Sequence, residues 1–331
     1  MDSAGAGRKR NGGGCTIVLR RFVSIPTSRL ATNLCGIALK NPVLAASGTF
    51  GYGIEFAHLL NLDELGGLVT KGISREPIAG NAAPRLWESE GGMLNSVGLQ
   101  NVGVREFVAA KLPKLREHSV PVFVNVFGYA SEDYAEVVRV LEDAEGIVAY
   151  ELNVSCPNVK QGGIYFSSDP SCLASLMGGV RPLAKRPLIV KLSPNVSAIE
   201  PLAKAAEDAG ADAISLVNTF RAMAIDAKTA KPRLGAGFGG LSGPAIKPIA
   251  LRFVYEAAQA VRVPIIGMGG IANGTDAAEF LIAGAQAVEV GTATFWNPRA
   301  PLEIAKGLDR FLRKKRLSNV RELVGTLQFE N

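Results

Sequence analysis

Residue types that hold metals or form disulfides are scarce in this sequence. Its 331 residues include four cysteines, at positions 15, 35, 156 and 172, and two histidines, His58 and His118. The cysteines form no C-x-x-C pair and neither histidine has a partner at metal-ligand spacing, which argues against a zinc site, an iron–sulfur cluster and a disulfide framework. Sparse, unpaired cysteines are typical of a reducing compartment, so we expect a cytoplasmic protein with no metal of its own.

Long hydrophobic runs are also missing. No apolar stretch approaches the roughly 20 residues that span a bilayer, and the first residues contain no secretory hydrophobic region of adequate length. The pattern G-x-x-x-x-G-K-[ST] is absent, which disfavours a P-loop nucleotidase. Aromatic residues make up 7% of the chain whereas glycine occurs 37 times, a balance that suits tight loops more than stacked aromatic platforms.

The net charge of +6 lies at the two ends of the chain. Residues 1–21 carry a net charge of +4 and residues 306–316 carry +5, which leaves −3 for the rest. Because the charge does not follow a central groove, we interpret both ends as solubilising or partner-facing, and we expect neither nucleic acid nor membrane as a partner. A non-catalytic flavin- or RNA-binding module, suggested by the basic tail Arg313-Lys-Lys-Arg316, is the alternative.

Eight short apolar runs recur along the chain, and each is followed by a polar or glycine-bearing loop and a helical pattern. Runs that are apolar throughout are typical of parallel strands covered on both faces. Eight such units favour an α/β fold of the (β/α)8 TIM-barrel type over an open doubly wound sheet. The runs are Val43–Ala46, Gly67–Thr70, Val122–Val126, Ile147–Leu152, Leu188–Leu192, Ala213–Val217, Val263–Gly267 and Ala287–Val290.

Helix boundaries are predicted from capping residues. Ser197-Ala-Ile-Glu200 has the pattern of a capping box, and Gly210 is the expected stop of that helix. Ser131 is expected to cap a second helix. Asn297-Pro298 is expected to provide the N-cap and first residue of the last helix.

The segment before the first barrel strand predicts a hairpin. Residues 33–40 offer two short strands around Gly36, which we expect to close the barrel floor. We divide the chain into an N-terminal extension at 1–26, a barrel at 27–317 and a C-terminal tail at 318–331. Long loops are expected over the opposite end of the barrel, its C-terminal mouth.

Polar residues and glycines follow the predicted strands, where a barrel carries its chemistry. Gly269-Gly270 and Gly291-Thr292 each precede a helix, and glycines there let N–H groups approach a phosphate. A dinucleotide fingerprint from Gly267, with Glu289 as the acidic residue, fits weakly, and plain tight turns are the third interpretation. The strand-end residues are Ser47, Lys71, Asn125, Asn153, Lys191, Asn218-Thr219, Gly269-Gly270 and Gly291-Thr292.

Three loops, at 72–102, 154–169 and 218–242, are longer than connectors need and are expected to be lids or binding loops. The second contains Cys156, whose thiol there can serve as a base or a nucleophile. No histidine lies in that stretch to activate it, which counts against a cysteine hydrolase. Inert packing is the alternative for Cys156 and the expectation for the other cysteines.

Six dispersed motifs resemble the class 1 dihydroorotate dehydrogenases, and the resemblance runs from about residue 34 to 308. Cys156 separates this chain from class 2, which has serine there and an N-terminal membrane helix. The stretch Ser155-Cys-Pro-Asn-Val-Lys-Gln-Gly-Gly163 is most similar to class 1B. The motifs are Lys71-Gly72, Asn95-Ser-Val-Gly-Leu99, Asn153-Val-Ser-Cys-Pro-Asn158, Lys191-Leu-Ser-Pro-Asn195, Gly239-Gly-Leu-Ser-Gly-Pro244 and Gly267-Met-Gly-Gly270.

The resemblance implies an FMN-dependent enzyme that oxidises (S)-dihydroorotate to orotate in pyrimidine synthesis. It implies that Cys156 removes a proton from substrate C5 while a hydride leaves C6 for flavin N5, and that Lys191 stabilises negative charge on the reduced flavin. The implied FMN contacts are Ser47, Lys71, Gly72, Asn125, Asn153, Lys191, Val217, Gly243, Gly269, Gly270, Gly291 and Thr292. The implied substrate contacts are Lys71, Asn95, Ser96, Val97, Gly98, Leu99, Asn153, Asn158, Asn218 and Thr219.

Class 1B also implies a partner. In that class a second subunit with FAD and a [2Fe–2S] cluster passes electrons to NAD, and a homodimer of catalytic chains forms the core of a heterotetramer. This chain has no cysteine set for a cluster, consistent with that need. Two other activities stay open: a class 1A homodimer that reduces fumarate, and a dihydropyrimidine dehydrogenase-like activity, which shares the barrel and a base cysteine.

Overall fold

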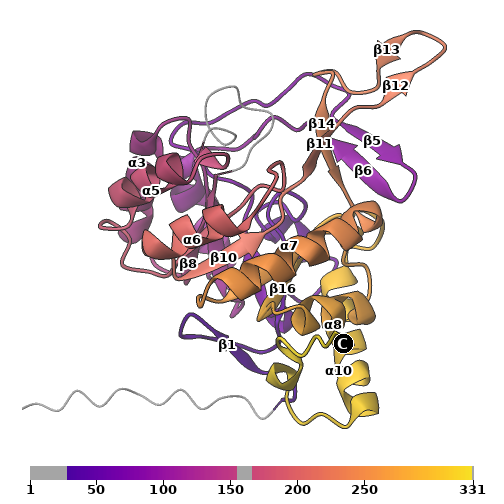
Figure 1. The fold of residues 1–331 in the computed structure, drawn as a ribbon. Coiled ribbons are helices and arrows are strands. Elements are labelled where there is room, and N and C mark those ends of the chain that lie inside the picture. Colours follow the sequence, from indigo (N-terminus) through magenta and orange to yellow (C-terminus); the bar gives the residue numbers. More distant parts are fainter. Residues whose placement is uncertain (1–27, 155–165, 330–331) are drawn as a thin grey trace, which may run out of the picture.

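Eight parallel strands close into a barrel in the computed structural model of the protein, which describes residues 28–154 and 166–329. Each strand pairs with the next one along the chain, and the last pairs with the first, so the predicted (β/α)8 architecture is confirmed (Figure 1). The barrel strands are β3 (Val43–Ala45), β4 (Gly67–Val69), β7 (Val122–Val126), β8 (Ala149–Asn153), β9 (Leu188–Lys191), β10 (Ala213–Leu216), β15 (Ile265–Met268) and β16 (Ala287–Val290).

A hairpin closes the floor of the barrel, as the sequence predicts. Strands β1 (Thr32–Leu34) and β2 (Ile37–Leu39) pair antiparallel across a turn in which Gly36 has φ +85°. Leu34 and Leu39 pack against one apolar side chain from each of the eight barrel strands, Phe123 and Ile189 among them. This inner layer and the hairpin together seal the lower end of the barrel against water.

The outward faces of the strands are covered by helices in every β–α unit except the first. There, between β3 and β4, a glycine-rich segment forms only the short 3-10 helices η1 (Ile54–Phe56) and η2 (Leu62–Glu64), since glycine disfavours a continuous helix. Among the described residues, no helix is long and apolar enough to cross a membrane. The other helices are α1 (Val104–Glu106), η3 (Phe107–Lys111), α2 (Leu112–Leu115), α3 (Ser131–Glu142), α5 (Pro170–Val180), α6 (Glu200–Asp208), η4 (Pro244–Ile246), α7 (Lys247–Ala260), α8 (Gly274–Ile282), α9 (Ala293–Trp296), α10 (Ala300–Lys315) and η5 (Val320–Leu323).

The capping box predicted at Ser197 is wrong, because α6 begins two residues later than a helix capped by Ser197 would. Its N-cap position is Ile199, which makes no side-chain cap. A helix capped by Ser197 would require Pro201 to donate an N–H to the Ser197 carbonyl, and proline has no N–H to donate. The helix therefore begins at Glu200, and it ends before Gly210, which has φ +89° as expected of a stop.

The start of the last helix is shifted for the same reason, because Pro301 has no N–H to donate. With Asn297 as N-cap, Pro301 would have to donate to the Asn297 carbonyl; instead the N–H of Ala300 does so at 2.8 Å and α10 begins there. Asn297 caps only the preceding turn, through the N–H of Arg299 at 3.0 Å. Ser131 is not a cap for a different reason: it is the first residue of α3, whose N-cap position is Ala130, and Asp133 accepts from the Ala130 N–H at 3.2 Å.

The loops over the mouth contain a second, four-stranded sheet. Strands β5 (Leu86–Ser89) and β6 (Gly92–Asn95) come from the first long loop, whereas β11 (Phe220–Ala222) and β14 (Gly239–Ser242) come from the third. Their order is β11-β14-β6-β5, and the small pair β12 (Ile225–Asp226) and β13 (Lys231–Pro232) projects beyond them (Figure 1). Two loops distant in sequence thus form one ordered layer above the barrel.

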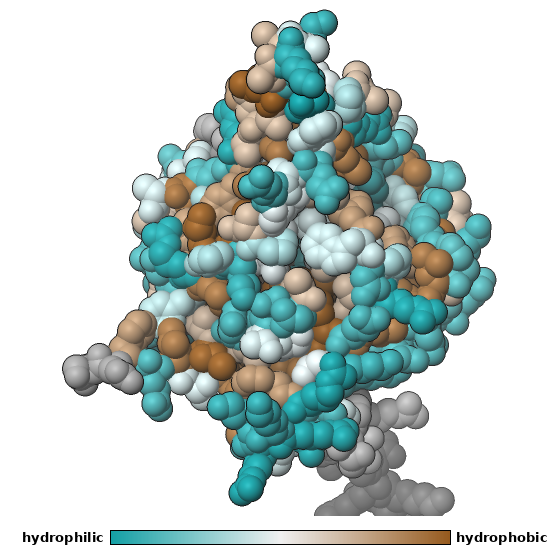
Figure 2. All heavy atoms as spheres, turned by 90° about the vertical axis from the view of Figure 1, so that its right-hand side faces the viewer, coloured by the Kyte–Doolittle hydropathy of each residue, from teal (hydrophilic) through white to brown (hydrophobic). Residues whose placement is uncertain are grey.

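This upper layer leaves hydrophobic side chains at the surface. Ile225 is 62% exposed, and Met223 and Phe238 are also exposed. Figure 2 shows hydrophobic residues near the top of this face, whereas its lower end, where α10 finishes in a run of basic residues, is hydrophilic. The two ends of the molecule therefore present different surfaces to partners.

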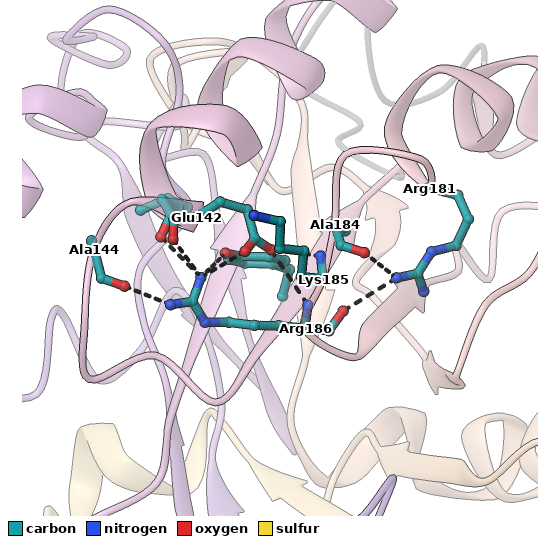
Figure 3. A network of polar contacts seen from close by, with 8 residues as sticks. Glu142, Ala144, Arg181, Ala184, Lys185 and Arg186 are labelled. Carbon is teal, nitrogen blue, oxygen red and sulfur yellow. Dashed lines mark hydrogen bonds and ion pairs between the residues drawn. The ribbon is translucent and has the colours of Figure 1, made fainter. Parts of the chain in front are cut away.

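Arg186, in the loop between α5 and β9, forms hydrogen bonds with the C-terminal end of α3 (Figure 3). The Arg186 guanidinium donates to the carbonyls of Leu141 and Ala144, to the Glu142 carboxylate at 3.2 Å and to the Tyr150 hydroxyl at 2.7 Å. Glu142 in turn accepts from the backbone N–H of Lys185 at 2.8 Å. The network satisfies carbonyls that a helix end leaves without partners.

We predict that Arg186→Met destabilises the fold by about 2–3 kcal/mol, because the largely buried Glu142 carboxylate loses its cation and several carbonyls lose their donors. The measurement is the free energy of unfolding in urea. Arg139→Met is the matched control, since Arg139 pairs with Glu136 on the exposed face of α3, and a loss of less than about 0.5 kcal/mol is expected there. Equal losses in the two variants would contradict the assignment.

Candidate active site at the barrel mouth

A cavity opens between the C-terminal ends of the barrel strands and the upper sheet. Every barrel strand contributes at least one lining residue at its end, which is the place where barrels carry their chemistry. All twelve residues expected to contact FMN line this cavity. They are Ser47, Lys71, Gly72, Asn125, Asn153, Lys191, Val217, Gly243, Gly269, Gly270, Gly291 and Thr292.

Most residues expected to contact the substrate line the same cavity, namely Lys71, Asn95, Val97, Gly98, Leu99, Asn153, Asn218 and Thr219. Ser96 does not: it is fully buried, and its hydroxyl accepts a hydrogen bond from Asn81 Nδ2 at 2.8 Å. Its side chain supports the loop, so a side-chain contact with substrate is not supported. Cys156 and Asn158 lie outside the described residues.

The cavity floor contains a buried cluster of three charged side chains. Lys191 Nζ lies 3.3 Å from Glu151 Oε1 and 3.6 Å from Glu289 Oε2, and it also donates to Ser47 Oγ at 3.0 Å. Glu151 accepts two further hydrogen bonds, from Asn125 Nδ2 at 2.6 Å and from Ser215 Oγ at 2.8 Å. All three charged side chains are at most 5% exposed.

The pKa values of Lys191 and Glu151 shift so as to keep the two groups charged. Burial acts to lower the pKa of Lys191, but the attraction of Glu151 and Glu289 outweighs it and the pKa is raised. Burial acts to raise the pKa of Glu151, but Lys191 and the hydrogen-bond donors outweigh it and the pKa is lowered. The result is a fixed cation beneath the cavity.

Our sequence reasoning missed Glu151 and treated Glu289 only as part of a weak fingerprint. The signal was present, since each is an acidic residue in the middle of an apolar strand run. Buried charges in such a position require a partner. Lys191, predicted from its place at a strand end, is that partner.

Amides and a second lysine line the upper part of the cavity. Asn218 Nδ2 donates to Asn153 Oδ1 at 3.1 Å, which fixes the orientation of both amides relative to each other. Lys71 is half-buried, and burial lowers the pKa of its ammonium group, against the opposing attraction of Glu55. An amide both donates and accepts, so this region suits a ring with alternating N–H and C=O groups.

Backbone donors gather at the ends of β15 and β16. In the part of the chain that the structure describes, the N–H groups of Gly269, Gly270, Gly291 and Thr292 have no acceptor. Gly270 has φ +78°, and a Cβ atom there would lie 2.8 Å from the Gly243 carbonyl oxygen, so only glycine fits. Four free donors in a glycine-lined cradle fit an anionic phosphate.

The helix after this cradle does not offer its own N-terminus. Asn273 accepts from the N–H groups of Thr275 and Asp276, and Asp276 accepts from those of Ala272 and Asn273. The first-turn N–H groups of this helix are thus satisfied by its own side chains and are not available as direct donors to a phosphate. The glycine N–H groups themselves form the cradle.

Free backbone donors suited to a phosphate, a fixed cation and a set of amides meet in one barrel mouth, and this combination fits the class of (β/α)8-barrel oxidoreductases that bind a phosphorylated flavin. The comparisons identify the family within that class. Residues 29–312 match the family model described as dihydroorotate dehydrogenase, and the chain belongs to this family of FMN-dependent oxidoreductases.

The curated relatives are named for two different electron acceptors, fumarate and NAD(+). A protein of Solibacter usitatus, provisionally named dihydroorotate dehydrogenase A (fumarate), is 68% identical over 92% of this chain and 100% of its own length. The catalytic subunit of dihydroorotate dehydrogenase B (NAD(+)) from Pelobacter propionicus is 52% identical over 90% of this chain and 98% of its own length. The identities alone do not assign the electron acceptor.

A solved structure confirms the fold. The crystal structure of DHODH from Eimeria tenella in complex with ferulenol superposes with a TM-score of 0.77 and covers 90% of this chain and 88% of that chain. At 22% sequence identity, the similarity concerns the barrel architecture alone.

We predict that Lys191→Met destabilises the fold by about 3–5 kcal/mol, because the buried Glu151 carboxylate loses the cation that lies 3.3 Å from it. The free energy of unfolding is the measurement. The double variant Glu151→Gln/Lys191→Met is expected to recover most of the loss, since it removes the charge that Lys191→Met leaves unpaired. Lys185→Met, at an exposed lysine of the preceding loop, serves as the control, and a loss equal to that of Lys191→Met would contradict the prediction.

Proposed function

We propose that this chain oxidises (S)-dihydroorotate to orotate as the catalytic subunit of an NAD-linked dihydroorotate dehydrogenase. The observation that carries the proposal is the single cavity in which residues from all eight strand ends meet the motifs Asn95–Leu99 and Asn218-Thr219. Family membership supports the activity, and the names of several relatives support the NAD-linked form.

FMN is the cofactor that the cavity fits. The N–H groups of Gly269, Gly270, Gly291 and Thr292 would hold its phosphate, and Lys191 would supply positive charge at the cavity floor. When bound, FMN supplies a ring that accepts a hydride. The chain itself binds the ring, excludes water from below through the hairpin, and holds a cation where negative charge develops.

The substrate-binding part of the proposal assigns roles to the upper residues. Lys71 would offset the substrate carboxylate, and Asn153 and Asn218 would bind the N–H and C=O groups of its ring. We assign to Cys156 the removal of the proton from substrate C5. We assign this role from the position of Cys156 in the Asn153–Asn158 motif. Loss of the C5 proton to Cys156 and of the C6 hydride to FMN would together form the new C5–C6 double bond.

A partner subunit with FAD and a [2Fe–2S] cluster would take the electrons to NAD. The relatives named as catalytic subunits support such a partner. The exposed hydrophobic side chains of the upper layer, Met223, Ile225 and Phe238, support a further contact with a second copy of the chain. We therefore propose a homodimeric core with one electron-transfer subunit on each catalytic chain, in the cytoplasm.

A fumarate-linked enzyme is the second candidate. The 68% identity to a relative provisionally named for fumarate is the observation that favours it. In that form the homodimer needs no partner subunit and passes its electrons to fumarate.

The electron acceptor is tested with the purified chain and dihydroorotate. We expect the FMN absorbance to bleach, little turnover with fumarate, and NAD reduction only when the partner subunit is co-expressed. Rapid turnover with fumarate in the absence of any partner would assign the chain to the fumarate-linked group. A dihydropyrimidine dehydrogenase-like enzyme would instead reduce uracil and fail to respond to dihydroorotate.

Cys156→Ala is expected to retain FMN and lose most turnover, by about 10²–10⁴-fold, as is typical when a positioned base is removed. Cys156→Ser should retain some activity at high pH, because a hydroxyl is a far weaker acid than a thiol. The steady-state rate with dihydroorotate is the measurement, and Cys172→Ala on α5 is the control. Native turnover by Cys156→Ala would rule out the base assignment.

A further inference from the structure

Glu289 is the member of the floor cluster whose carboxyl oxygens accept no hydrogen bond within 3.5 Å among the described residues. It lies on β16, is 1% exposed, and lines the cavity. The polar groups nearest to it are Lys191, with Nζ at 3.6 Å, and the carboxyl group of Glu151, to which a protonated Glu289 can donate. Glu151, in contrast, is satisfied by Asn125, Ser215 and Lys191.

The cluster has one ammonium group for two carboxyl groups. Lys191 lies 3.3 Å from Glu151 and 3.6 Å from Glu289, and only Glu151 also accepts hydrogen bonds from Asn125 and Ser215, so the negative charge is better stabilised on Glu151. A second carboxylate without donors would be a buried negative charge beside another, which is strongly unfavourable in an apolar interior. Burial raises the pKa of Glu289 well above its usual range, repulsion from Glu151 adds to this, and the attraction of Lys191 opposes it.

No other titratable side chain faces Glu289 among the described residues. Lys191 comes from β9 and Glu151 from β8, across the barrel interior. On the two strands that pair with β16, the residues in register with Glu289 are Leu44 of β3 and Met268 of β15, and both are apolar. The protonation of Glu289 therefore depends on these two charges and on what occupies the cavity.

We propose that Glu289 is a neutral carboxylic acid in the folded protein and that its neutrality keeps the charge of Lys191 available to a ring that gains negative charge in the cavity. The inference rests on the proposed FMN function. Glu289 acts through Lys191 and is a positioning residue. If it ionised, two carboxylates would neutralise one ammonium, and the cavity floor would oppose the arrival of electrons.

Infrared spectroscopy of the FMN-loaded protein tests the protonation state directly. At about pH 8 ordinary carboxyl groups are ionised, so a buried acid is recognised by the carbonyl stretch of its protonated form. We expect this band in the wild type and its loss in Glu289→Gln. A wild-type spectrum without the band, or a band that persists in Glu289→Gln, would overturn the proposal.

Sulfite binding tests the consequence for the cavity. Sulfite adds to an oxidised flavin and places negative charge on its ring, so its affinity reports the charge beneath the ring without any turnover. At about pH 7 we expect Glu289→Gln to bind sulfite with an affinity within about twofold of the wild type, because both side chains are neutral. If Glu289 were ionised, the same substitution would remove a charge near Lys191 and strengthen binding by on the order of tenfold or more.

The pH dependence of these properties also distinguishes Glu289 from the glutamine of the Glu289→Gln variant. As pH rises through the ionisation of Glu289, wild-type affinity for sulfite and the reduction potential of FMN should fall below those of Glu289→Gln. A carboxyl with a raised pKa also contributes stability that declines as pH rises from the ordinary value of 4.5. The wild-type melting temperature should therefore fall more steeply with pH than that of Glu289→Gln, and parallel profiles would contradict the proposal.

The outcomes distinguish this inference from the proposed function. A chain that binds no FMN would refute the function, and infrared and melting measurements would still report whether Glu289 is protonated. A chain that binds FMN and oxidises dihydroorotate but shows no protonated Glu289 would keep the function and refute the inference. If Glu289→Gln does not fold, Glu289→Leu provides the same uncharged comparison.

Discussion

One ammonium group between two buried carboxyl groups is the interaction on which the cavity depends. Lys191, Glu151 and Glu289 come from three different strands, and two further strands supply Asn125 and Ser215. Strands β7 to β10 are neighbours in the sheet, but Glu289 on β16 meets Lys191 and Glu151 only because the sheet closes on itself. Closure of the barrel is thus both a folding requirement and the step that assembles the charged floor.

The sequence predicted the rim of the cavity better than its floor. Strand-end residues such as Lys71 and Asn125 could be found because a parallel barrel brings every strand end to one edge, whatever the remaining geometry. Glu151 lies on the strand next to that of Lys191, whereas Glu289 could not be paired from the sequence, because it reaches Lys191 across the barrel interior. Ser96 shows the same limit in a loop: its neighbours line the cavity, but its own orientation depends on packing against Asn81.

Capping residues also mispredicted the starts of two helices, and the physical reason is the same in both. At both Ser197 and Asn297 a good capping residue precedes the helix, yet a proline at the fourth following position, Pro201 or Pro301, moves the start. The missing N–H of proline has a larger effect than the modest stabilisation from a cap. The upper sheet was missed for another reason: β6 pairs with β14, and neither long loop alone contains that partner.

The lower end of the barrel interior is apolar and closed, whereas the upper end is charged and open to the cavity. The hairpin fills the lower end with Leu34 and Leu39, so water cannot reach the charged layer from below. In the resulting low dielectric the pair of Lys191 and Glu151 is strong, and a second unpartnered carboxylate is costly. Compensation can then come only from above, through the cavity. A ligand bound there meets a floor whose charge is fixed in advance, which is the condition under which electrostatic stabilisation costs no reorganisation as charge develops.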